Sequence, residues 1–203
     1  MTARAENTKQ KILQAAEPEF AEKGIYGARV DEIAVRAGVN KRMLYAYFGS
    51  KEQLYVAVIE EIYRRLAEWE APLLTQCAGS AEEVVRLLIR SYFDFLGRNT
   101  SFVKIVMREN LNEAQYLRLS AAKDIKGKTL ALLQKSLQTG IENGTFRADI
   151  DLAETVLSIN LLCFSYFSNG YTFTQLLQTD FMSKDEICRR ADHVTDMILK
   201  YLK

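Results

Sequence analysis

The chain has 203 residues, of which 48% are hydrophobic and 26% charged, and its formal net charge is only +1. This balance excludes a disordered chain and a polycation, and the length allows a small domain beside a larger one with its own core. Lys and Arg outnumber Asp and Glu in residues 1–51, whereas residues 66–203 are nearly balanced. A positive excess confined to one end fits contact with phosphate groups there.

Composition also points to helices. The chain has two prolines and ten glycines, and the alternating runs typical of strands are absent, so we expect an all-α fold with about nine helices. Residues 155–179 lack charge, but polar residues interrupt them, and no apolar run approaches the roughly 18–20 residues that span a bilayer. The polar N-terminus shows no signal-peptide pattern. Cys77, Cys163 and Cys188 form no CxxC pair, which favours a reducing compartment and buried thiols.

The first predicted helix covers roughly residues 6–23. Apolar residues recur at spacings of four from Ile12 to Phe20, which is the pattern of one buried helix face. Gly24 is suited to end this helix. Pro18 predicts a kink, with the helix continuing through Phe20.

Two short helices are predicted next, at about residues 30–37 and 41–47. Gly38 supplies the turn between them, and Asn40 is the expected N-cap of the second. Two short helices joined by a tight glycine-containing turn are typical of a helix-turn-helix, whose second helix enters the major groove of DNA.

The candidate DNA contacts lie in and beside this second helix. Lys41 and Arg42 stand at its start, where long cationic side chains can reach guanine edges or phosphates. Tyr45 and Tyr47 follow, with hydroxyl groups suited to phosphate contacts. Lys51 stands at the start of the next helix, where free backbone N–H groups and the helix dipole favour a phosphate.

The remaining helices are bounded by capping residues. Ser50 with Gln53 predicts a helix that ends near Trp69, before Pro72. Later boundaries follow from Ser80 with Glu83, from Gly144, from Asp149 or Asp151, and from Ser183 with Glu186. The predicted helices are residues 81–97, 100–110, 113–143, about 152–169 and about 184–202.

The uncharged helix predicts an interface. Its apolar residues surround the whole helix instead of forming one stripe, so it must be buried nearly all round. Packing it against the last helix and against the same pair from a second copy satisfies this requirement. We therefore expect a homodimer formed through the last two helices.

The body of the chain is rich in aromatic residues, which favours an apolar pocket with a few polar groups for a small apolar or aromatic effector. The candidate pocket residues are Trp69, Arg90, Phe93, Phe102, Arg108, Glu109, Asn160, Phe164 and Phe167.

Residues 8–58 resemble the N-terminal domain of the TetR family of bacterial transcriptional regulators. The matching residues are Ile12-Leu13, Ala15-Ala16, Phe20, Gly24, Ile33-Ala34, Ala37-Gly38-Val39, Leu44-Tyr45, Tyr47-Phe48, Ser50-Lys51-Glu52 and Leu54. The resemblance implies a bacterial cytoplasmic homodimer on double-stranded DNA with a palindromic operator, and a C-terminal effector domain. It divides the chain into a DNA-binding domain, residues 1–52, and an effector-binding and dimerisation domain, residues 53–203.

Departures at two places qualify this resemblance, and a further segment extends it to the body of the chain. The family usually has Thr or Ser where Arg29 stands; Arg29 cannot cap the helix that follows but can contact phosphate by charge. The pair Pro18-Glu19 also breaks the usual pattern. In the body, the segment 144–151, GTFRADID, is similar to one type of C-terminal domain in the family.

The resemblance favours a repressor released by its effector, and an activator remains open. A helical adaptor that binds protein instead of DNA is disfavoured by the placement of Lys41, Arg42 and Lys51. An enzyme is disfavoured because the single histidine, His193, has no nucleophile nearby and no HExxH, GxSxG or P-loop occurs. No cofactor or metal site is expected, since no cluster of ligand residues is present.

Overall fold

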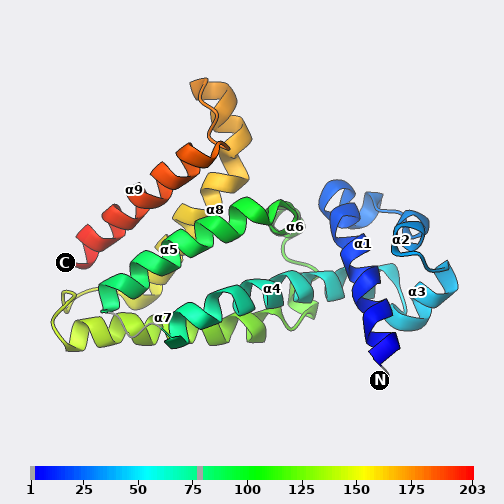
Figure 1. The fold of residues 1–203 in the computed structure, drawn as a ribbon, viewed down its shortest axis with the longest axis horizontal. Coiled ribbons are helices and arrows are strands. Elements are labelled where there is room, and N and C mark those ends of the chain that lie inside the picture. The colour runs from blue at the N-terminus through cyan, green and yellow to red at the C-terminus, as the bar shows by residue number, and fades with distance from the viewer. Residues whose placement is uncertain (1–2, 77–79) are drawn as a thin grey trace. The chain divides into compact units, whose positions relative to one another are not determined.

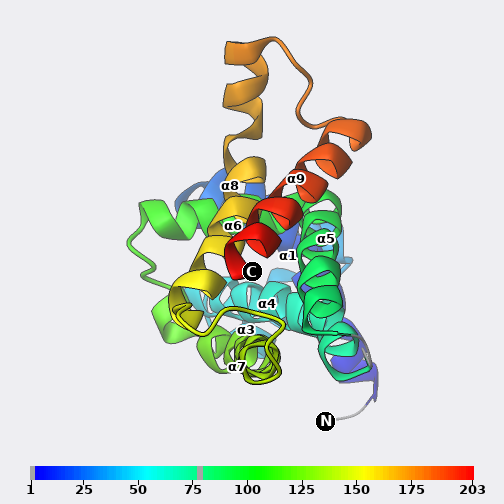
Figure 2. The same ribbon diagram turned by 90° about the vertical axis from the view of Figure 1, so that its left-hand side faces the viewer.

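The computed structural model describes residues 3–76 and 80–203, and its regular structure there is helical throughout (Figures 1 and 2). The all-α expectation is confirmed, and none of the described helices is long and apolar enough to cross a membrane. The helices are α1 (Ala3–Gly27), α2 (Val30–Ala37), α3 (Lys41–Phe48), α4 (Lys51–Gln76), α5 (Ala81–Arg98), α6 (Thr100–Leu111), the 3₁₀ turn η1 (Leu117–Leu119), α7 (Ala122–Glu142), α8 (Leu152–Leu177) and α9 (Lys184–Leu202).

The chain divides into two compact units. One comprises Met1–Arg65 and Ser101–Ile125, and the other comprises Leu66–Thr100 and Lys126–Lys203. The helix α4 therefore belongs to both: its first part lies in the first unit and its last part in the second.

The first unit is built around aromatic rings. The ring of Phe20 in α1 lies 4.9 Å from that of Tyr55 in α4, and Tyr55 lies 5.3 Å from Tyr116. All three side chains are buried, as is Leu44 of α3. The predicted helices α2 and α3 are confirmed, with Gly38 at a φ of 66° in the turn between them. Only glycine adopts this left-handed conformation without strain.

Helix α1 is interrupted at Gly24 and not at Pro18. Gly24 has φ 68° and ψ 176° and is the residue of α1 with non-helical dihedral angles. The helix runs through Phe20 as predicted, and one further turn follows Gly24. Arg108 of α6 satisfies carbonyls at this interruption: its Nε donates to the Ala21 carbonyl at 3.0 Å and its Nη2 to that of Glu22.

The prediction of one helix over residues 113–143 is wrong. Glu113 and Ala114 have φ angles of 54° and 58°, so the backbone leaves the helical region just after α6, and α7 begins only at Ala122. Buried Glu109 stabilises the connection: its Oε2 accepts from the backbone N–H groups of Tyr116 at 3.1 Å and Leu117 at 2.8 Å. The helical periodicity of this segment did not show that a side chain would cap its backbone.

Two helices are longer than predicted. α4 continues through Pro72 to Gln76, because proline removes only one backbone hydrogen bond and the rest of the helix can persist with a bend. α8 continues past Asn169 to Leu177, ending at Gln178, which has a left-handed φ of 52°.

In the second unit, α5 packs against both α8 and α9 (Figures 1 and 2). The capping box of Ser80 and Glu83 is confirmed. Ser183 accepts from the Glu186 N–H as predicted, but the Glu186 carboxylate pairs with Arg189 instead of completing a box. Of the two candidates for the start of α8, it is Asp151 that accepts from the N–H groups of residues 153 and 154.

The cysteines differ from one another. Cys163 is buried, and burial raises the pKa of its thiol to about 12, as expected for a small core residue. Cys188 is exposed, so the expectation of a buried thiol is wrong there. Cys77 lies outside the described residues.

Two glycines in helices should differ in their response to substitution by alanine. A Cβ at Gly140 would lie 2.3 Å from Cδ2 of Phe146 and 2.9 Å from the Cβ of Ala81, neither of which can move freely. At Gly170 the obstacle is the end of the flexible Met182 side chain. We expect Gly140→Ala to lower the free energy of unfolding by about 1–3 kcal/mol, and Gly170→Ala to leave it nearly unchanged. Urea denaturation measures both; equal effects would contradict the packing around Phe146.

Candidate DNA interface and effector region

Helix α3 has one buried and one exposed face. Leu44 and Phe48 are buried and anchor the helix, which packs against α2, and Asn40 caps it by accepting from the Met43 N–H at 2.7 Å. The opposite face carries the predicted contact residues Lys41, Arg42 and Tyr45, all exposed. A rigid short helix with cations and a phenol on its free face has the arrangement that major-groove recognition needs.

The cations of this face differ in their partners. Lys41 Nζ lies 3.0 Å from Asp31 of α2, a hydrogen bond and charge that raise the pKa of the lysine. Both side chains are about half or more exposed, so the pair contributes little and Lys41 can exchange it for a phosphate. Arg42 forms no ion pair with any described residue and is available to DNA.

The other predicted contact residues lie around α3. Asn40 is exposed, and its amide nitrogen remains available because only Oδ1 is used in the cap. Tyr47 is half-buried. Lys51 is also half-buried, and its Nζ lies 3.5 Å from the Tyr26 carbonyl, while Ser50 Oγ accepts from the Gln53 N–H at 3.1 Å. The first turn of α4 therefore combines a cation with backbone N–H groups.

Arg29 stands at the N-cap of α2, exposed and without a side-chain cap, as the sequence predicts. Its backbone N–H is instead satisfied by Glu19 of α1, whose Oε1 accepts it at 3.2 Å. Glu19 is buried, and Lys23 Nζ and Arg36 Nη2 lie 2.8 and 3.8 Å from its carboxylate. In the sequence, Glu19 is visible only as an irregularity beside Pro18; the signal that marks it is a charged residue on an otherwise apolar helix face.

Replacing Glu19 with Gln should destabilise the first unit in a pH-dependent way. Burial alone raises the pKa of this carboxyl, but hydrogen bonds from Lys23 and the Arg29 N–H and nearby positive charge outweigh it and lower the pKa. A carboxyl whose pKa is lowered by folding stabilises the folded state at every pH above its ordinary pKa. This stabilisation is lost as the pH falls through the pKa of the folded state. We expect Glu19→Gln to cost about 1–3 kcal/mol at neutral pH, and the difference from the unsubstituted chain to shrink in acid. Urea denaturation across pH measures it; a difference independent of pH would contradict this account.

The predicted effector residues are not gathered in one place. Phe102, Arg108 and Glu109 lie in the first unit, and the others lie in the second. Phe102 is buried with its ring 5.4 Å from that of Tyr63, Arg108 binds the carbonyls of α1, and Glu109 caps the segment after α6. These contacts give all three a structural role.

Within the second unit, Phe93 lies beside other predicted effector residues. Phe93 packs against Phe167 with a centroid distance of 5.7 Å, and Phe93 and Arg90 line a cavity of about 600 Å³ between α5 and α9. Arg90 also forms an exposed ion pair with Asp192 at 2.7 Å. Trp69 is partly exposed and donates to Ser91 Oγ at 2.7 Å.

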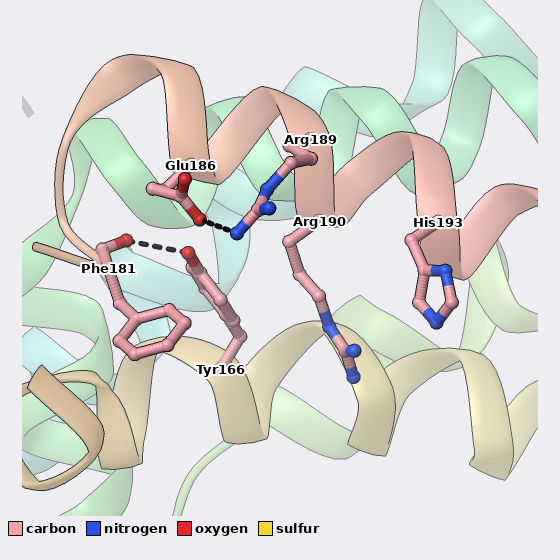
Figure 3. A pocket seen from close by; sticks show the side chains of 6 residues that line it. All are labelled: Tyr166, Phe181, Glu186, Arg189, Arg190 and His193. Carbon is pink, nitrogen blue, oxygen red and sulfur yellow. Dashed lines mark hydrogen bonds and ion pairs between the residues drawn. The ribbon is translucent and has the colours of Figure 1, made fainter. Parts of the chain in front are cut away.

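Asn160 and Phe164 lie on α8. Asn160 is half-buried, donates to the Val156 carbonyl at 2.8 Å and lines a cavity of about 20 Å³; Phe164 is half-buried. A further cavity of about 290 Å³ lies between α8 and α9 (Figure 3), and the single histidine of the chain, His193, lines it. There the Tyr166 hydroxyl donates to the Phe181 carbonyl at 2.6 Å, and Arg190 points from α9 toward α8 (Figure 3).

Comparison with known proteins decides the family. A model for bacterial regulatory proteins of the tetR family matches residues 12–58, and one for a tetracyclin repressor-like C-terminal domain matches residues 82–198. The chain belongs to the TetR family of bacterial transcriptional regulators. The transcriptional repressor NicS of Pseudomonas putida is 33% identical over 200 residues, covering 98% of this chain and 94% of NicS. YdgC, an uncharacterised regulator of Bacillus subtilis, is 25% identical over 177 residues, covering 86% of each chain.

Solved structures agree on the fold. FadR from Bacillus subtilis, in complex with stearoyl-CoA, superposes with a TM-score of 0.74 at 21% identity, covering 96% of this chain and 99% of FadR. Membership of the TetR family makes the protein a helix-turn-helix transcriptional regulator that binds DNA and not an enzyme, and members of this family bind ligands and are typically dimers.

Proposed function

We propose that this protein represses transcription as a homodimer on a palindromic operator and that a small effector bound by the second unit releases it. The observation that carries the proposal is the free face of α3, where Lys41, Arg42 and Tyr45 stand exposed on a helix held by Leu44 and Phe48. The likeness to the repressor NicS over nearly the whole chain supports repression over activation. We also propose that Arg29, Asn40, Tyr47 and Lys51 contact the DNA backbone.

The dimer is proposed to form through α8 and α9. Large apolar side chains on these helices are exposed, which is unusual for helices of a protein that stays single. On α8 they include Leu157 and Leu161 at spacing four, 49% and 56% exposed, and on α9 Met197 and Tyr201 at the same spacing, 43% and 44% exposed. Two copies related by a twofold axis would bury these rows against each other.

We propose residues 1–52 as the DNA-binding domain and residues 53–203 as the domain for effector and dimer contacts. The effector would bind the DNA-binding conformation and the released conformation with different affinities. The difference in binding free energy in such systems is typically about 1–3 kcal/mol. Since DNA is its target in the bacterial cell, we place the protein in the cytoplasm.

Selection of duplexes from a random pool by the purified chain tests this proposal. We expect bound sequences with two inverted half-sites one helical turn apart, and an affinity that falls steeply with salt. A reporter under the selected operator then separates repression from activation. Bound sequences without twofold symmetry, or no retained duplex at low salt, would overturn the proposal.

A further inference from the structure

We infer that the effector is a small organic acid whose carboxylate takes the place of Glu70 beside Lys126. This inference rests on the proposed function and names the chemistry of its effector. Lys126 of α7 and Glu70 of α4 form an ion pair in the second unit, with Nζ donating to Oε1 at 2.6 Å. The side chain of Lys126 is 14% exposed to solvent and that of Glu70 is 8% exposed, so both charged groups have lost most of their hydration.

Stability does not account for this pair. Removing two charges from water costs several kcal/mol per ion, and apolar residues in place of a buried pair are often equally or more stabilising. The surroundings are mostly apolar: Leu88, Leu130, Leu133 and Ile159 line the space beside the pair. A costly pair between two helices at such a place fits a role in binding.

The space beside the pair is small. The cavity there measures about 20 Å³, enough for about one water molecule and too small for an organic molecule. Both Glu70 and Lys126 line it. A ligand can therefore enter only when one member of the pair moves away.

Glu70 is the member that moves. The Lys126 ammonium also lies over the ring of Tyr92, 5.6 Å from its centroid, and this attraction stays when the carboxylate leaves. Glu70 lies two residues before Pro72, whose missing N–H removes one hydrogen bond from the end of α4. The position that Glu70 leaves faces a fixed cation, so the incoming group is an anion, and a carboxylate matches the one it replaces.

Displacement of Glu70 also supplies a route to regulation. The helix that carries it begins at Lys51, in the unit that contains the helix-turn-helix. An acid that binds only when Glu70 is displaced therefore favours one state of α4 over another, which is the differential affinity that regulation needs.

The test uses the purified full-length chain without DNA. Acetate, butyrate and benzoate are each compared with the amide and the amine of the same carbon skeleton, by thermal shift and isothermal titration calorimetry. We expect saturable binding of at least one acid and weaker or no binding of its amide and amine. Lys126→Met should weaken acid binding by about thirtyfold or more, and Glu70→Gln should strengthen it severalfold by removing the competing carboxylate.

Lys128→Met is the matched control, because Lys128 is an exposed lysine on the same helix, and it should bind the acid as the unsubstituted chain does. If Lys126→Met fails to fold, the double variant Lys126→Met/Glu70→Met removes both charges and should likewise lose acid binding. Preferential binding of amines, unchanged acid binding in the Lys126 variants, or no binding of any acid would overturn the inference. Because no DNA is present, a failure to bind duplexes bears only on the proposed function.

Discussion

Replacing Lys41 and Arg42 together with alanine will reduce operator affinity by at least about a hundredfold while leaving the fold intact. Both side chains are exposed on the free face of α3, so their loss disturbs no core contact, and each substitution occurs twice in the proposed dimer. Loss of a base contact typically costs ten- to hundredfold, and loss of a phosphate contact also lowers the salt dependence. Fluorescence anisotropy of a labelled operator at several salt concentrations measures both effects.

Arg98→Ala is the matched control, since Arg98 is an exposed arginine of α5 paired with Asp94 at 2.7 Å. Its operator affinity and salt dependence should equal those of the unsubstituted chain. If the double variant of α3 bound the operator as tightly as this control, α3 would not be the recognition helix.

The sequence predicts the helix-turn-helix better than the helices and connections that follow it. The helix-turn-helix is local: Gly38, Asn40 and the apolar anchor Leu44 act within a few residues, so spacing alone places α2 and α3 correctly. Glu19 shows the limit of this approach, because its partner, the Arg29 N–H, lies ten residues away on the next element. A pattern along one helix cannot reveal an acceptor supplied across a turn.

The effector region was less accessible to prediction. The sequence marks polar and aromatic residues of the right kinds, but Arg108 and Glu109 turn out to bind backbone groups, a use that depends on where α1 and the segment after α6 run. Glu70 and Lys126 were missed because each looks like a solvated helix residue, and only their pairing across α4 and α7 shows that both are buried. Long-range pairing of this kind leaves no periodic signal in the sequence.

Phe20→Ala should be the most disruptive single substitution in the first unit. Phe20 is fully buried on α1, and its ring contacts that of Tyr55 on α4, so truncation leaves a cavity between two helices. Loss of a buried phenylalanine side chain costs about 3–5 kcal/mol, a large part of the stability of a small unit. Urea denaturation followed by circular dichroism should show this loss. Operator binding should weaken because fewer molecules carry a folded helix-turn-helix.

Phe20→Leu separates the effect of side-chain volume from that of the aromatic ring. Leucine fills most of the same volume without an aromatic ring, so we expect a loss of only about 1 kcal/mol and near-normal operator binding. The fluorescence of Trp69 reports on the other unit, where its ring lies 6.0 Å from that of Phe95. It therefore measures whether that unit stays folded in the Phe20 variants. If Phe20→Ala lowered the free energy of unfolding by less than about 1 kcal/mol, the ring could not be the centre of the core that holds α1 on α4.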